Sequence, residues 1–134
     1  MLTLVTGLSG FTGRYIQAEL EENGHKVVGL RSDLTDFQDV TKEIKQVQPE
    51  GVVHLAGIAF VGHGNVNAFY DVNLLGTRNL LEALEKNAPN VRSLLLASSA
   101  NVYGNFSDGM LNEDTKPEPI NDYAVSKLAM EQMA

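Results

Sequence analysis

Short apolar runs alternate with helical patterns along the 134-residue chain. The apolar runs are nearly continuous, as in the strands of a parallel sheet that is covered on both faces. Between them, apolar side chains recur with the spacing of one face of an amphipathic helix. We therefore expect strands at residues 2–6, 26–30, 51–55 and 91–97, separated by helices that end at Gly24, at Pro49 and near Lys86.

Strands that alternate with helices predict one α/β domain over residues 1–134. The expected architecture is a Rossmann-like, doubly wound parallel sheet with helices on both faces, which binds ligands at the carboxyl ends of its strands. The spacing between the second strand and the helix at 36–48 leaves no room for a helix and a further full strand. That crossover is therefore abbreviated or absent.

Composition removes several classes of function. The formal net charge of −7 argues against nucleic-acid binding, which depends on Lys and Arg that neutralise phosphates. The chain has no cysteine, and His25, His54 and His63 lack the spacing of metal ligands, so no metal site is expected. The N-terminus carries neither a basic export signal nor a long apolar segment. These features predict a cytoplasmic protein without a membrane anchor.

Glycines are concentrated where the first strand passes into the first helix. Gly7, Gly10 and Gly13 recur at every third position, and Phe11 follows Gly10. The motif lies where a predicted strand passes through a loop into a predicted helix. Glycines at such a junction permit a tight turn and let the helix N-terminus approach a pyrophosphate without an intervening Cβ. An ordinary glycine-rich turn is the alternative, but the context favours a dinucleotide site.

Tyr123 and Lys127 are spaced four residues apart, which places them on one face of a helix. The ammonium can favour ionisation of the phenol and prepare it for proton transfer. Alone, this pair is a common surface feature. A second signal supports a catalytic role, because the predicted strand at 91–97, which we expect to be buried, ends in hydroxyls. We expect Ser98 to cap the strand and Ser99 to contact a reacting oxygen.

Taken in this order, the motifs resemble the extended short-chain dehydrogenase/reductase family, across essentially the whole chain. Two further segments agree with it, the turn at 54–57 and the helical segment at 71–77. The resemblance implies that Tyr123 is the general acid/base, that Lys127 binds the nicotinamide ribose, and that Ser99 polarises the reacting sugar oxygen. Asn73 would support the active site structurally.

The resemblance also implies an NAD(P) cofactor. Arg31 follows the second strand, where many NAD-preferring relatives carry an acidic residue, so NADP is slightly favoured. The cofactor-binding residues that we expect are Gly7, Gly10, Phe11, Gly13, Arg31, Asp33, Leu34, Leu55, Ala56, Gly57, Asn73, Tyr123 and Lys127.

Residues next to Ser99 narrow the chemistry. Dehydratases of this family typically carry an acidic residue there, whereas this chain has Ala100 and Asn101. A nucleotide-sugar 4-keto reductase and a 4-epimerase of the UDP-glucose type remain, with most similarity to the GDP-6-deoxy-4-keto-mannose reductase and GDP-mannose dehydratase branch. A non-catalytic, cofactor-binding module is a further alternative. The substrate side would include Phe60, Val61, Ser99 and Asn101, while His63 fits a substrate contact or a solvated loop equally well.

Members of the family are longer, since the segment after the Tyr-Lys helix supplies the last strands and a small domain that holds the nucleotide sugar. We therefore expect these 134 residues to provide the cofactor part and the catalytic residues without that substrate part. The resemblance also implies a homodimer through the helices at 65–86 and 123–134.

Overall fold

The computed structural model describes residues 1–60, 64–105 and 109–134. Its centre is a parallel sheet of four strands in the order β2-β1-β3-β4. The strands are β1 (Leu2–Thr6), β2 (Lys26–Gly29), β3 (Gly51–His54) and β4 (Ser93–Leu96).

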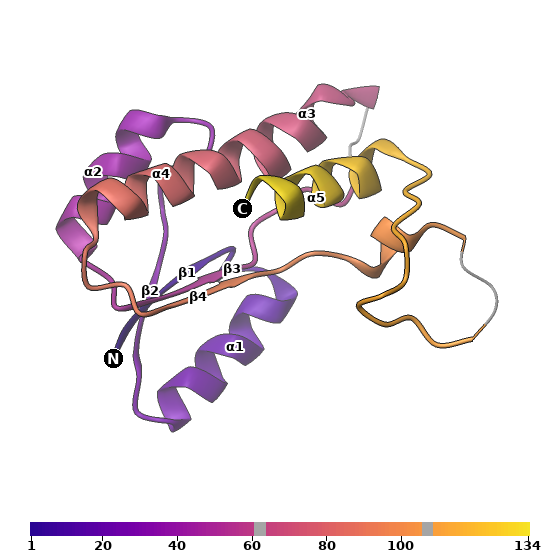
Figure 1. Ribbon diagram of the computed structural model, residues 1–134. Helices are drawn as coiled ribbons and strands as arrows, with labels where there is room; N and C mark the ends of the chain where they lie inside the picture. The colour runs from indigo at the N-terminus through magenta and orange to yellow at the C-terminus, as the bar shows by residue number, and fades with distance from the viewer. Residues whose placement is uncertain (61–63, 106–108) are drawn as a thin grey trace.

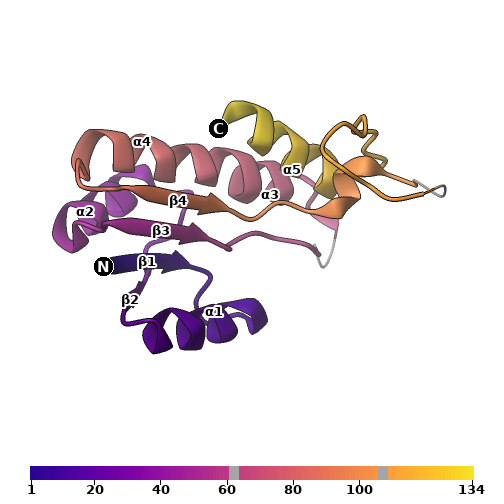
Figure 2. The ribbon, with the colours of Figure 1, turned by 60° about the horizontal axis from the view of Figure 1, so that its bottom comes forward.

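Helices cover both faces of this sheet. Figures 1 and 2 show α1 on one face and α2, α4 and α5 on the other. The predicted Rossmann-like fold class is therefore confirmed. The helices are α1 (Phe11–Glu22), α2 (Phe37–Val47), α3 (Asn67–Phe69), the π-helix η2 (Tyr70–Gly76), α4 (Thr77–Asn87), the 3₁₀-helix η3 (Ala100–Tyr103) and α5 (Asp122–Met133).

Local sequence explains the bounds of α2. The side chain of Asp36 accepts hydrogen bonds from the backbone N–H groups of Gln38 and Asp39, both at 3.0 Å, and so caps the first turn. Gln48 ends the helix in a left-handed conformation, with a φ of 49°, and Pro49 prevents its continuation. The buried face of α2 packs with α4 and the sheet in one apolar core, which includes Leu4, Val40, Ile44, Val52 and Leu80.

The short connection after β2 determines the topology. Residues 30–36 lead directly into α2, and the described residues contain no strand between β2 and α2. The chain then enters β3, which pairs with β1 on the side opposite β2. This agrees with the abbreviated crossover that the spacing predicts. The carboxyl ends of β1 and β3 therefore lie side by side at the topological switch point, where doubly wound sheets bind their ligands.

The structure differs from expectation at β4, which was predicted to be buried. Leu94 is 43% exposed and Leu95 is 54% exposed. The reason is that β4 is an edge strand, paired with β3 alone. Leu95 lies in the same row as Val5 on the face of α1, and α1 packs against β1 and β2. The apolar pattern of residues 93–96 predicts a strand, but it does not predict that this strand lies at the edge of the sheet.

Candidate functional site

The glycine loop is packed too closely to accept side chains. Gly7 has a φ of 70°, and a Cβ there would lie 2.9 Å from the backbone nitrogen of Ala56. A Cβ on Gly13 would lie 2.4 Å from the carbonyl oxygen of Leu8. The loop is therefore held tightly between the carboxyl end of β3 and the first turn of α1.

The N-terminus of α1 is open to a ligand. Gly10 is its N-cap and has no side chain to bond the first-turn amides. Those amides and the helix dipole favour an anion at this end. Phe11 and Tyr15 lie exposed beside it, with ring centroids 5.2 Å apart. The fit to a pyrophosphate therefore rests on backbone donors and on the absence of a Cβ at Gly10.

An open pocket of about 680 Å³ lies beside this loop. It is bounded by the glycine loop, by α1 and by the end of β2, and two of its lining residues are cationic, Arg14 and Arg31. Arg31 was predicted from the sequence, but Arg14 was not. The signal that could have found Arg14 is its place one helical turn after Gly10, on the helix that follows the loop. Two guanidinium groups at this pocket suit a ligand with more than one phosphate.

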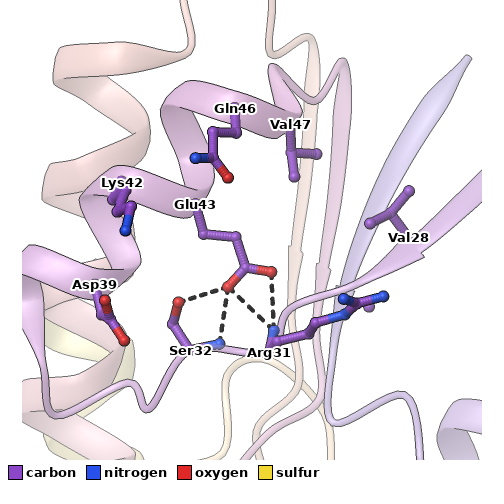
Figure 3. Close-up of a pocket in the computed structure, with 9 residues that line it drawn as sticks. Val28, Arg31, Ser32, Asp39, Lys42, Glu43, Gln46 and Val47 are labelled. Carbon is purple, nitrogen blue, oxygen red and sulfur yellow. Dashed lines mark hydrogen bonds between the residues drawn. The ribbon is translucent and has the colours of Figure 1, made fainter.

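Figure 3 shows a second pocket, of about 340 Å³, between β2 and α2. The Glu43 carboxylate accepts hydrogen bonds from the backbone N–H groups of Arg31 at 3.0 Å and Ser32 at 2.8 Å, and from the Ser32 hydroxyl. Burial favours the neutral acid, but these hydrogen bonds outweigh it, so the pKa of Glu43 lies below its ordinary value. Glu43 therefore fixes the backbone after β2, while the Arg31 guanidinium extends away toward Val28.

The two residues predicted to meet the adenine have different environments. Asp33 is exposed, and hydrogen bonds from the backbone and the hydroxyl of Thr35 hold the pKa of its carboxyl below the ordinary value. Leu34 belongs to the apolar core, and its carbonyl oxygen accepts a hydrogen bond from the Asn79 side chain at 2.9 Å. Contact of either residue with adenine stays a prediction.

The turn after β3 joins several of the predicted residues. Asn73, in the π-helix, accepts from the Ile58 N–H at 2.8 Å and donates to the Ile58 carbonyl at 2.9 Å. A Cβ on Gly57 would lie 3.0 Å from Asn73 Oδ1 and 3.8 Å from Lys127 Nζ. Asn73 also donates to the Ser126 hydroxyl on α5. Asn73 therefore links the turn after β3 to α5, and its role in an active site stays a prediction.

Lys127 lies at the centre of the candidate site. It is 5% exposed, and Nζ donates a hydrogen bond of 2.6 Å to the carbonyl oxygen of Ala97, just beyond β4. Burial lowers the pKa of Lys127, and the charge of Glu131 opposes this shift only in part. Tyr123 lies one turn earlier on α5 and packs against Phe69, with ring centroids 6.0 Å apart. The pair therefore borders the carboxyl ends of the strands.

The two serines after β4 make different contacts. Ser98 donates a hydrogen bond to Glu131 on α5. Ser99 is the N-cap of η3, and its Oγ accepts from the N–H of Asn101 at 3.2 Å. The hydroxyl proton of Ser99 has no protein acceptor among the contacts of the described residues, so it can be donated to a ligand.

The predicted substrate residues lie partly within the described chain. Phe60 is 85% exposed after the β3 turn, and Asn101 is exposed on η3. Val61 and His63 lie outside the described residues. Contact of these residues with a substrate stays a prediction.

Within residues 1–60, 64–105 and 109–134, no three His, Asp or Glu side chains form a group that could hold a metal ion. No helix in those ranges is both long enough and apolar enough to cross a membrane.

Comparison with known proteins gives one family over nearly the whole chain. Residues 3–134 match the model of the NAD dependent epimerase/dehydratase family. A GDP-6-deoxy-D-talose 4-dehydrogenase from Aggregatibacter actinomycetemcomitans is 36% identical over 99% of this chain and 47% of its own length. A GDP-6-deoxy-D-mannose reductase from Pseudomonas aeruginosa is 39% identical over 96% of this chain and 44% of its own length. The chain thus spans about half the length of the curated relatives it matches.

Solved structures agree with the fold and differ in the cofactor that their names state. The UDP-glucose 4-epimerase of Thermus thermophilus, in complex with NAD, superposes with a TM-score of 0.88 at 31% identity over 99% of this chain and 49% of that one. RMD from Pseudomonas aeruginosa, complexed with NADPH, gives a TM-score of 0.83 at 35% identity over 98% of this chain and 47% of that one.

Proposed function

Because the chain belongs to the NAD dependent epimerase/dehydratase family, we propose that it provides the cofactor site and acid–base residues of a nucleotide-sugar oxidoreductase. The reaction is the reduction of a 4-keto-6-deoxy sugar nucleotide. Lys127 carries this proposal, since its buried ammonium lies one turn after Tyr123 beside the carboxyl ends of the strands. Burying a charged ammonium costs free energy of desolvation, and ionisable groups that are buried at a ligand-binding edge are often functional ones.

The residues divide the chemistry between them. NAD(P)H, when bound, supplies the hydride that reduces the carbonyl carbon. The phenol of Tyr123 gives its proton to the carbonyl oxygen, so the product is an alcohol and the tyrosine is left as a phenolate. Lys127 stabilises that phenolate, and the free hydroxyl proton of Ser99 bonds the reacting oxygen. These roles are proposals for the described positions.

The substrate class is argued from the relatives and from the residues beside Ser99. Two relatives are named for GDP-linked 6-deoxy sugars, which supports a GDP-linked substrate. Ala100 and Asn101 offer no carboxyl group for the elimination that a dehydratase performs. The exposed side chains of Phe60 and Asn101 are proposed to meet the sugar nucleotide.

NADP is proposed as the preferred cofactor. Arg14 and Arg31 both line the pocket beside the glycine loop, where their charges can meet the additional phosphate of NADP. Glu43 already occupies the backbone amides of Arg31 and Ser32. The phosphate would therefore be bound by guanidinium groups rather than by those amides.

A 4-epimerase is the second candidate. The superposition on the Thermus thermophilus UDP-glucose 4-epimerase at 31% identity favours it. Epimerisation at C4 can use the same serine, tyrosine, lysine and cofactor, but it returns the hydride and consumes no net NAD(P)H. A cofactor-binding protein without activity is the remaining alternative.

Cofactor binding is the first test. We would titrate the purified protein with NADPH and NADH by calorimetry, together with Gly10→Val, which places a branched side chain at the open end of α1. A Cβ there would lie 3.2 Å from the Gly7 carbonyl oxygen and would reach into the pyrophosphate position. Ala18→Val, on the exposed face of the same helix, is the matched control.

We expect saturable binding by the wild type and by Ala18→Val, tighter for NADPH, and at least a tenfold loss in Gly10→Val. A folded wild type that binds neither nucleotide would contradict the proposal. With binding established, net NADPH consumption on a GDP-linked 4-keto-6-deoxy sugar supports the reductase. Interconversion of 4-epimers without net consumption would support the epimerase instead.

A further inference from the structure

His54 is a buried polar side chain at the end of an otherwise apolar strand. It is 1% exposed, and its ring lies between two hydroxyls, with Nδ1 2.6 Å from Thr6 Oγ1 and Nε2 2.8 Å from Thr77 Oγ1. Both threonines are buried as well. Burying polar groups costs free energy unless every donor and acceptor is paired. The ring therefore needs a fixed arrangement of protons.

Two outer contacts determine that arrangement. Thr77 donates its hydroxyl proton to the carbonyl oxygen of Asn73 at 2.8 Å, so toward His54 it can only accept. Nε2 of His54 therefore carries the proton. The Ala56 N–H donates to Thr6 Oγ1 at 3.0 Å, which leaves the Thr6 hydroxyl proton for Nδ1. One directed chain results, from Ala56 through Thr6 to the ring, and from the ring through Thr77 to Asn73.

The opposite tautomer would break this chain twice. An Nδ1–H would donate to Thr6 Oγ1, which already accepts from the Ala56 N–H, so the Thr6 hydroxyl proton would be left without an acceptor among the contacts of the described residues. A bare Nε2 would face a Thr77 oxygen whose proton is already bonded to Asn73. An imidazolium would meet the first of these conflicts. The neutral Nε2–H ring alone satisfies every partner.

The ends of the chain lie on both sides of the candidate site. On one side, Thr6 ends β1 and is followed by Gly7, whose close approach to Ala56 holds the glycine loop. On the other, Asn73 bonds both backbone groups of Ile58 and the Ser126 hydroxyl beside Lys127. A change at His54 is therefore transmitted to both.

We propose that His54, as the neutral Nε2–H tautomer, is a positioning residue that couples the end of β1 to Asn73. It thereby fixes the position of the glycine loop and the position of Lys127 on α5. The coupling to the cofactor rests on the proposed function. The proton arrangement and the coupling to Asn73 do not.

The tautomer is tested by nitrogen-15 NMR of the histidine ring in the wild-type protein near neutral pH. We expect His54 to show a protonated Nε2 and an unprotonated Nδ1. An Nδ1–H tautomer, an imidazolium, or rapid averaging between tautomers would overturn the proposal.

The coupling is tested with His54→Phe, Thr77→Val and the double variant. The readouts are the exchange rate of the Asn73 side-chain amide protons and the affinity for NADPH. We expect each single variant to accelerate exchange at least tenfold and to weaken NADPH binding, and the double variant to be no worse than the more severe single one, because one chain is broken in each. Additive effects, or unchanged exchange in folded variants, would overturn the proposal.

Thr41→Val is the matched control, since the hydroxyl of Thr41 is buried without a hydrogen-bond partner. It should leave both readouts unchanged, and a change equal to that of Thr77→Val would overturn the proposal. If the wild type does not bind NADPH, the proposed function fails, while the tautomer and the Asn73 exchange rate still decide the role of His54.

Discussion

Lys127 combines a buried charge with a backbone hydrogen bond to Ala97. Its ammonium therefore has a fixed position relative to Tyr123, which a flexible surface lysine would lack. Burial alone favours the neutral amine. The hydrogen bond to the Ala97 carbonyl and the negative charge of Glu131 favour the charged ammonium instead.

Replacing the ammonium tests its role. We expect Lys127→Met to lower kcat for the proposed reduction by roughly 100-fold, because the phenolate of Tyr123 loses its stabilising cation. The rate of NADPH consumption at saturating substrate measures this effect. Lys45→Met, which removes an exposed lysine on α2, is the control. An unchanged kcat in Lys127→Met would contradict the assignment.

Single residues also show where sequence reasoning ends. Gly7 and Gly13 were singled out by a glycine motif at the end of the first strand, Lys127 by its helical spacing from Tyr123, and Asn73 by the family resemblance, and the structure places all of them around one edge of the sheet. Arg14 was missed although its place after Gly10 could have indicated it, and the contacts of His54 could not be predicted. A hydrogen bond between β3 and α4 depends on side-chain positions across the fold, which no local spacing records.

At the scale of elements, the segment after β2 depends on α2. Glu43 projects from α2 and accepts hydrogen bonds from Arg31 and Ser32, so the helix determines the path of the chain at the edge of the pocket beside the glycine loop. Its negative charge also attracts the charge of Arg31, although the guanidinium extends away from the carboxylate, and so reduces the positive potential there.

Glu43→Gln separates these two effects. The amide retains a hydrogen-bond acceptor for the loop but loses the charge, so we expect NADPH to bind roughly fivefold tighter and NADH affinity to stay unchanged. Calorimetry with both nucleotides measures the ratio. Glu85→Gln, on the exposed face of α4, provides the comparison. A weaker NADPH affinity would show that the charge of Glu43 is needed to hold the loop.

The elements themselves were predictable to within a few residues, because their apolar residues recur with the periods of strands and helices; those of β1, α2, β3 and α4 pack in one core. Periodicity did not distinguish the edge strand β4 from a central one, since both read as apolar runs. Nor did it reveal the π-helix, whose backbone pattern lies within a continuous helical segment.

For the whole molecule, His54 links stability to pH. Burial, with a smaller effect from the charge of Lys127, lowers the pKa of His54 to about 4 from an ordinary value of 6.5. Between these values the unfolded chain binds a proton that the folded protein excludes. The contribution is fully present above pH 6.5 and is lost as the pH falls toward 4, by up to about 3 kcal/mol.

Urea unfolding across this range measures the slope. We expect the free energy of unfolding of the wild type to fall steadily from pH 6.5 to pH 4.5, and His54→Phe to show a shallower slope whatever its absolute stability. Equal slopes would assign the pH dependence to carboxylates, whose ordinary pKa values lie lower.

The homodimer and the bound sugar nucleotide stay predictions of the family resemblance at this scale.

The central place of β1 also orders the way in which the sheet assembles. β1 and β2 pair within residues 2–29, whereas β3 and β4 must close much longer loops before they pair. Loop-closure entropy therefore favours β1–α1–β2 as the first native unit of these elements, and this unit is also synthesised before β3 and β4. The glycine loop is thus expected to form early in folding, and Tyr123 and Lys127 on α5 to reach their places after it.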